Sequence, residues 1–285
     1  MSETEVIITG SGTPIPVADR AGPGVLVRRG DVTLQFDAGR STVQRLTAAG
    51  VWIPDLTAFF ATHHHSDHLT ALQDLVLTAW VMDRDLAGRV LPIVVPAGPA
   101  ASFAHRMLDA WDHDLDVRMQ HAGRTVPPQY EVIAFQYPEH PTEVWSTTDV
   151  RVLAGQVRHE PVHPAVGYRI ETPEGVVAIT GDTLVCDEVA ELADGCDVLV
   201  YEAMRFESVE RRPPHLRFIL DYHADTRLIG RQAAELGVPT LVLTHLIPPP
   251  RDDAERQAFV DDIRAGGYEG ELIVADDLDR VVLAG

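Results

Sequence analysis

The sequence contains no lysine, only two cysteines and no hydrophobic run long enough to span a bilayer. All 23 basic residues are arginines, which excludes chemistry that needs a lysine Schiff base or a lysine nucleophile. Cys186 and Cys196 are too few for a disulfide framework, and this fits a reducing compartment. The opening Ser2-Glu3-Thr4-Glu5 has neither the basic nor the apolar part of a signal peptide. We therefore expect a cytoplasmic protein with no membrane association.

Acidic residues dominate the charge balance. The chain has 43 aspartates and glutamates against its 23 arginines, and its formal net charge is −20. This balance argues against a protein that grips the phosphates of nucleic acid, so a small molecule is the expected substrate. A local basic patch could still bind nucleic acid despite the negative net charge of the chain. The best candidate for such a patch is the set Arg205, Arg211, Arg212 and Arg217, which is interrupted by Glu207 and Glu210. Its charge pattern is more typical of a solvated loop.

The length and the hydrophobic pattern favour one α/β domain over residues 1–285. Hydrophobic residues make up 45% of the chain, which is enough for a full core. Segments with strand and helix periodicity alternate throughout, and no linker or repeat divides them. The pattern weakens over Leu115–Trp145, where several prolines interrupt it. We expect the region around residues 97–148 to be an insertion that caps a pocket.

The densest group of metal-binding side chains lies in Thr62–His68, in the pattern His-x-His-x-Asp-His. It directly follows the apolar run Leu56–Ala61, so it should sit where a strand ends and a loop begins. His63 and His65 alternate along an extended segment and can therefore bind one ion together. After the turn, Asp67 and His68 can face a second ion, and imidazole and carboxylate suit zinc and related divalent metals.

A binuclear site needs about three to four protein ligands per ion, so four residues do not suffice. Three further candidates each follow an apolar strand, where loops commonly build sites. They are His159, Asp182 in Thr180-Gly181-Asp182-Thr183, and His245. His163, four residues after His159, competes with it for the same role.

In this order the candidates resemble the ligands of the metallo-β-lactamase superfamily over essentially the full length of the chain. The motifs Gly10-Ser11-Gly12-Thr13-Pro14 and Gly167-Tyr168-Arg169-Ile170 more narrowly resemble its ribonuclease Z and arylsulfatase-like branch. The resemblance implies a four-layer αβ/βα sandwich with the site at one edge of the paired sheets. Dimers are common in the family, so a homodimer is expected by the same analogy.

The resemblance also implies a role for each candidate. Two divalent ions are expected, zinc first, with manganese or iron fitting the same ligands. His159 is preferred over His163 because the related pattern His-x-Pro-Val-x-Pro-Ala-x-Gly-Tyr places the ligand first. Relatives that reduce oxygen or nitric oxide with two irons carry a glutamate at the position of His65, so the histidine indicates a hydrolytic site. The implied ligands are His63, His65 and His159 for one ion, Asp67, His68 and His245 for the other, and Asp182 between them.

Two more residues resemble catalytic groups of the ribonuclease Z branch. His223 resembles a histidine that assists the leaving group, and Glu202 the carboxylate that orients it. The implied activity is hydrolysis of a small-molecule phosphodiester or sulfate ester by a metal-bridging hydroxide, which Asp67 would help to position. One alternative is tRNA 3′ processing, although residues 205–221 are too short for the long basic arm of that branch. A further alternative is hydrolysis of a lactone or thioester. A non-catalytic metal protein would lack a ligand or the proton donor, and neither is missing.

Overall fold

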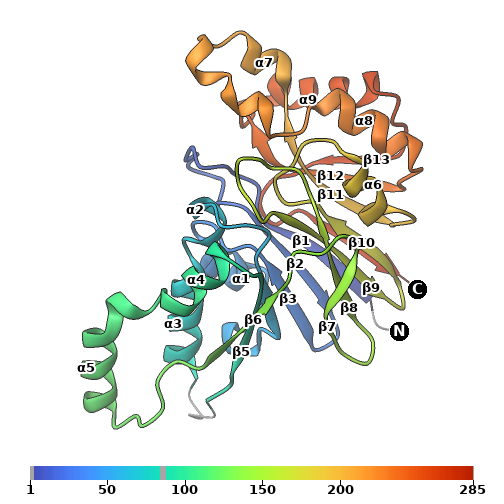
Figure 1. The fold of residues 1–285 in the computed structure, drawn as a ribbon. Coiled ribbons are helices and arrows are strands. Elements are labelled where there is room, and N and C mark those ends of the chain that lie inside the picture. Colours follow the sequence, from blue (N-terminus) through green and yellow to red (C-terminus); the bar gives the residue numbers. More distant parts are fainter. Residues whose placement is uncertain (1–2, 84–87, 285) are drawn as a thin grey trace.

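Two β-sheets packed face to face, with helices on both outer faces, make up the computed structural model, which describes residues 3–83 and 88–284 (Figure 1). The described strands form two seven-stranded sheets. The first sheet has the order β14 (Arg280–Ala284), β1 (Glu3–Gly10), β2 (Gly24–Arg29), β3 (Val32–Phe36), β4 (Ala58–Phe60), β5 (Leu91–Pro96) and β6 (Tyr130–Phe135). The second has the order β13 (Glu271–Val274), β12 (Thr240–Ile247), β11 (Val198–Met204), β10 (Gly175–Ile179), β9 (Val166–Thr172), β8 (Arg151–Gln156) and β7 (Thr142–Ser146).

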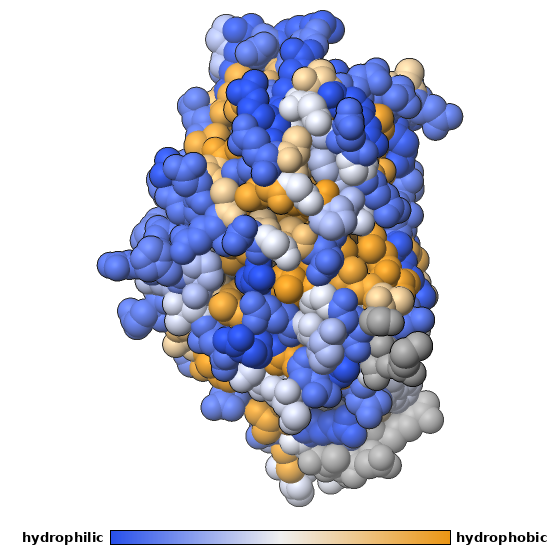
Figure 2. Space-filling view, turned by 90° about the vertical axis from the view of Figure 1, so that its right-hand side faces the viewer, coloured by the Kyte–Doolittle hydropathy of each residue, from blue (hydrophilic) through white to orange (hydrophobic). Residues whose placement is uncertain are grey.

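The helices are divided between the two outer faces and the connecting loops. On the side of the first sheet lie α1 (Thr42–Ala48), α2 (Ser66–Leu69), α3 (Leu72–Met82), α4 (Pro99–Arg106) and α5 (Asp112–Ala122), with the short 3-10 helices η1 (Ile53–Asp55) and η2 (Asp109–Trp111). On the side of the second sheet lie α6 (Asp187–Ala193), α7 (Phe206–Glu210), α8 (Thr226–Glu235) and α9 (Asp253–Ala265), with η3 (Pro214–Leu216) and η4 (Phe218–Asp221). No described helix is long and apolar enough to cross a membrane. Hydrophilic residues cover most of the face drawn in Figure 2.

Three hydrophobic clusters account for the four layers. The central cluster joins the two sheets, with Phe36 and Phe60 of the first sheet stacked 4.7 Å apart and Tyr168 of the second sheet against them. A second cluster lies between the first sheet and α1, α3 and α4, and a third between the second sheet and α6, α8 and α9. Each sheet is thus covered on both faces, which explains why β11 is buried at every residue. The predicted single-domain αβ/βα sandwich is confirmed.

Parallel pairing brings the site residues to one edge. β3 to β6 run parallel in the first sheet, and β10 to β13 run parallel in the second. The loops after parallel strands open at their carboxyl ends, where α/β sheets place their ligand sites. The sheets are also tied together there, because the Tyr168 hydroxyl donates to the carbonyl of Ala61 at 2.6 Å. The N–H of Val166 donates to the carbonyl of Thr62 at 2.9 Å.

The region around residues 97–148 is built into the sheets. Its strands β6 and β7 are the edge strands of the first and second sheets, so the region carries the chain from one sheet to the other. The prolines around β6 hid both strands from the sequence pattern. The helices α2 and α3 are separated by a break, where the N–H of Ala71 donates to the carbonyl of Ala38.

Candidate metal centre

The loop after β4 is held rigidly at its first residue. Asp37 accepts hydrogen bonds from both the N–H and the hydroxyl of Thr62, each at 2.8 Å. The same hydroxyl lies 2.9 Å from His63 Nδ1, which fixes the ring and leaves Nε2 facing the interior. The loop therefore presents His63 in one orientation.

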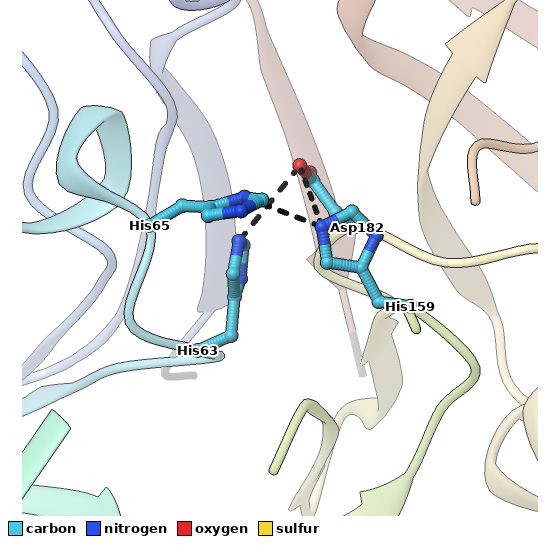
Figure 3. Close-up of side chains that lie close together, drawn as sticks. All are labelled: His63, His65, His159 and Asp182. Carbon is cyan, nitrogen blue, oxygen red and sulfur yellow. Dashed lines mark hydrogen bonds and ion pairs between the residues drawn. The ribbon is translucent and has the colours of Figure 1, made fainter. Parts of the chain in front are cut away.

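A first group of ligand atoms contains His63, His65, His159 and Asp182, and these atoms all lie within 4.8 Å of one another (Figure 3). His159 Nε2 is 3.3 Å from His65 Nδ1. Asp182 Oδ2 is 3.9 Å from the Nε2 atoms of both His63 and His159. The carbonyl of Tyr222 lies 2.9 Å from His159 Nδ1 and so orients this ring toward the group.

His163 takes no part in this arrangement. Its ring packs against Tyr137 with the centroids 4.5 Å apart, and among the described residues it belongs to none of the groups able to hold a metal. The geometry thus brings His159, and not His163, to the other histidines.

A second group consists of Asp67, His68 and His245. Asp67 Oδ2 lies 3.7 Å from His68 Nε2 and 3.5 Å from His245 Nε2. Asp182 joins the two groups, because its Oδ2 is also 3.4 Å from His68 Nε2 and 3.6 Å from His245 Nε2. One carboxylate oxygen therefore lies against both sets of imidazoles, where the sequence predicted a bridging ligand.

The buried polar atoms of the two groups identify what the site can bind. Unpaired polar atoms in a protein interior are costly and rare, so a cluster of them calls for a bound partner. Imidazole nitrogens and carboxylate oxygens in sets of three or four are the ligands that zinc and neighbouring divalent ions take. The residues present fit two such ions. In these two groups, the buried atoms that have no hydrogen-bond partner among the described residues are His63 Nε2, Asp67 Oδ2, His68 Nε2, Asp182 Oδ1 and both ring nitrogens of His245.

The electrostatics keep most of these groups in the form that binds a cation. Burial lowers the pKa of His63 well below its ordinary value and that of His159 to about 4, so both imidazoles are neutral. Burial opposes ionisation of Asp182, but the neighbouring His245 and His68 outweigh it and hold the pKa of the carboxyl well below its usual range. The centre therefore offers free nitrogen lone pairs beside an ionised carboxylate.

His223 and Glu202 form a buried pair next to the second group. His223 Nδ1 lies 2.8 Å from Glu202 Oε1, which also accepts the backbone N–H groups of Thr183 and Ala224. Burial lowers the pKa of His223, but the Glu202 carboxylate outweighs this and raises it to about 9. The His223 ring stacks on His245 with the centroids 5.5 Å apart. A charged imidazole thus faces the metal-binding groups.

The structure adds two supporting residues that the sequence reasoning did not place in the site. Asp37, besides holding Thr62, has its Oδ2 atom 2.7 Å from His68 Nδ1 and so positions this ring. Gly181 has φ +61°, and a Cβ there would lie 2.7 Å from Thr62 Cβ. The glycine is required to bring Asp182 against His63. The signal for Asp37 was its place directly after β3, the parallel neighbour of β4.

Comparison with known proteins gives relatives over the whole chain. A family model described as the beta-lactamase superfamily domain matches residues 33–246. A ribonuclease Z of Mycobacterium bovis is 37% identical over 279 residues, which cover 97% of each chain. A ribonuclease Z of Mycolicibacterium gilvum is 36% identical over 97% of this chain and 95% of the relative.

Solved structures share the fold at lower identity. The metallo-beta-lactamase fold protein YhfI of Bacillus subtilis superimposes with a TM-score of 0.72 at 21% identity, over 98% of this chain and 99% of the other. The short form of human tRNase Z gives a TM-score of 0.71 at 18% identity, over 98% and 99% of the two chains. At these identities the likeness concerns the fold alone.

Proposed function

This chain belongs to the beta-lactamase superfamily, in the branch of the ribonuclease Z relatives, and we propose that it is a metal-dependent ribonuclease that cuts a phosphodiester bond of RNA near a 3′ end. The observation that carries the proposal is the match of 37% identity over 97% of the chain to a relative named ribonuclease Z. The relatives carry the name of a nuclease. This favours a phosphodiester over the sulfate ester, lactone and thioester considered from the sequence, and RNA over a small molecule.

The proposed centre takes two divalent ions, with zinc as the first candidate. One ion would be held by His63, His65 and His159. The other would be held by Asp67, His68 and His245, and Asp182 would bind both ions. When bound, such a pair of ions lowers the pKa of a water molecule and polarises the phosphoryl oxygen. The unpaired buried nitrogens and carboxylate oxygens support this assignment.

His223 is the proposed general acid. The Glu202 carboxylate raises the pKa of His223 and so favours the imidazolium, which can donate a proton to the departing oxygen. Glu202 keeps the ring in place through Nδ1 and leaves Nε2 for the substrate. A positive imidazolium also stabilises negative charge that develops on the phosphoryl group.

The net charge of −20 does not decide against RNA, because it is a sum over the whole chain. Binding depends on the charges that surround the site. The arginines of residues 205–221 lie in the segment that leads directly to His223. Two of them, Arg212 and Arg217, form no ion pair with a carboxylate among the described residues, and this supports contact with a phosphate there.

Cleavage of RNA is the direct test. The metal-loaded protein should remove the 3′ extension of a tRNA-like precursor, and His159→Ala or metal removal should abolish the cut. His163→Ala is the matched control and should retain activity, because His163 lies outside the two groups. Hydrolysis of bis(p-nitrophenyl) phosphate by a protein that leaves the precursor intact would overturn the ribonuclease proposal in favour of a small-molecule diesterase.

A further inference from the structure

The segment between α7 and α8 exposes apolar side chains close to the candidate centre. Phe218 is 58% exposed and Leu216 is 40% exposed. In Figure 1 the orange α7 and the turns near it project above the sheets. An exposed aromatic ring in such a position indicates a binding role only if the fold does not need the ring for packing.

Neighbouring residues anchor the segment without the help of Phe218. Ile219 and Leu220 pack against a small cluster formed by Met204, Val209 and Ile247. This packing fixes η4 on the body of the protein. The Phe218 ring lies outside this cluster and contacts the Tyr222 ring at a centroid distance of 6.2 Å.

Tyr222 connects this exposed ring to the centre. Its ring lies 4.8 Å from that of His223 and 5.1 Å from that of His159. Its carbonyl orients His159 through Nδ1. A continuous row of rings therefore runs from the surface at Phe218, through Tyr222, to the proposed general acid and a proposed metal ligand.

Unpaired positive charge accompanies the row. Arg211 forms an ion pair with Glu207, but neither Arg212 nor Arg217 pairs with a carboxylate among the described residues. The exposed Arg217 uses Nε to donate to the carbonyl of Arg212 at 2.7 Å, and no carboxylate among the described residues lies within 4 Å of its guanidinium group. These two guanidinium groups are therefore available to an anion beside the row of rings.

We propose that Phe218, backed by Tyr222 and flanked by Arg217, receives an unpaired nucleobase and its phosphate next to the bond that is cut. The proposal rests on the ribonuclease function proposed above and adds the form of the substrate. A base can stack on an exposed ring only when it is free of a partner base, and an arginine can neutralise the adjoining phosphate. The preferred RNA is therefore single-stranded at the cut.

Abasic RNA provides the test. The precursor RNA would be compared with versions that lack the base on the 5′ or the 3′ side of the cut. The wild-type protein should cleave the intact RNA about tenfold faster, as kcat/KM, than one of the abasic versions, which is the size expected for one stacked base. Phe218→Ala should bring the two rates within about twofold of each other, and Phe218→Trp should restore the difference. Leu216→Ala is the control, because Leu216 is exposed on the same segment but has no ring.

The outcomes separate this proposal from the one on which it rests. If the wild-type protein cleaves the RNA but Phe218→Ala keeps the full preference for the base, the stacking site is wrong and the ribonuclease function stands. If the wild-type protein cleaves none of the RNAs, the ribonuclease function fails and the stacking site fails with it. Melting temperature and metal content of each variant, unchanged from the wild type, would show that lost preference is not lost folding.

Discussion

The two ends of the parallel strands contrast in what they offer a ligand. The carboxyl ends carry the histidine and aspartate groups. The amino ends border a hollow of about 850 Å³, whose lining includes Thr33, Thr57 and Leu91 at or near the starts of β3, β4 and β5, together with Trp52 and Trp80.

Three arginines that line the hollow already have partners, and this is the instructive difference. Arg28 pairs with Glu5, and Arg89 with Asp55. Arg124 donates to backbone carbonyls and lies over the Trp80 ring. At the carboxyl ends, by contrast, several buried nitrogens and oxygens have no hydrogen-bond partner in the part of the chain that the structure describes. Unsatisfied hydrogen-bond donors and acceptors, rather than empty volume, identify the end of the strands that carries the candidate active site.

The largest effect should come from removing the residue that joins both groups. Asp182→Ala takes away the one oxygen that lies within 4 Å of His63, His159, His68 and His245. We expect both ions to bind more weakly and kcat/KM to fall by about 10³-fold or more, since metal catalysis supplies several kcal/mol. Metal content by elemental analysis and RNA cleavage would measure this. A variant that keeps two ions and near-normal cleavage would show that Asp182 does not join the centre.

An intermediate effect is expected for the proton donor. His223→Ala should lower kcat by about 10²-fold, the usual contribution of a general acid, while the metal content stays normal. Glu202→Gln retains the volume and one acceptor oxygen but loses the charge that supports the imidazolium, so its loss should be smaller, about tenfold. Single-turnover cleavage together with metal analysis would separate the two roles. Loss of metal from His223→Ala would instead identify His223 as a ligand, because its ring lies near Asp182 and His245.

The sequence allowed much of this end of the molecule to be predicted, because His63, His159 and Asp182 come shortly after apolar strands and His245 lies near the carboxyl end of β12. His63, His159, Asp182 and His245 come together once the carboxyl ends of those strands share one edge. Contacts between loops that are distant in the sequence could not be predicted from it. The support of His68 by Asp37, 31 residues away, depends on how the strands pair.

The substrate was harder to predict than the ligands. Net charge is a sum that hides a local segment such as residues 205–221. The edge strands β6 and β7 were missed for a related reason, because they lie among prolines that interrupt periodicity. The pairing of β6 and β7 depends on neighbours brought together by the fold, which no window along the sequence contains.

The smallest effect on catalysis should come from the hollow, although stability should suffer there. In Trp80→Phe, the donor to the carbonyl of Val126 is lost, and the ring beneath Arg124 becomes smaller. We expect the free energy of unfolding to fall by about 2 kcal/mol, from one hydrogen bond and weaker packing. Because the residue lies at the amino ends of the strands, kcat/KM should change by less than about twofold, a difference far below 1 kcal/mol in barrier height. Urea unfolding and RNA cleavage would measure the two quantities on the same preparation. If cleavage instead fell tenfold in a folded variant with its full metal content, the two ends would be coupled through the sheet, and the hollow would have to be treated as part of the working site.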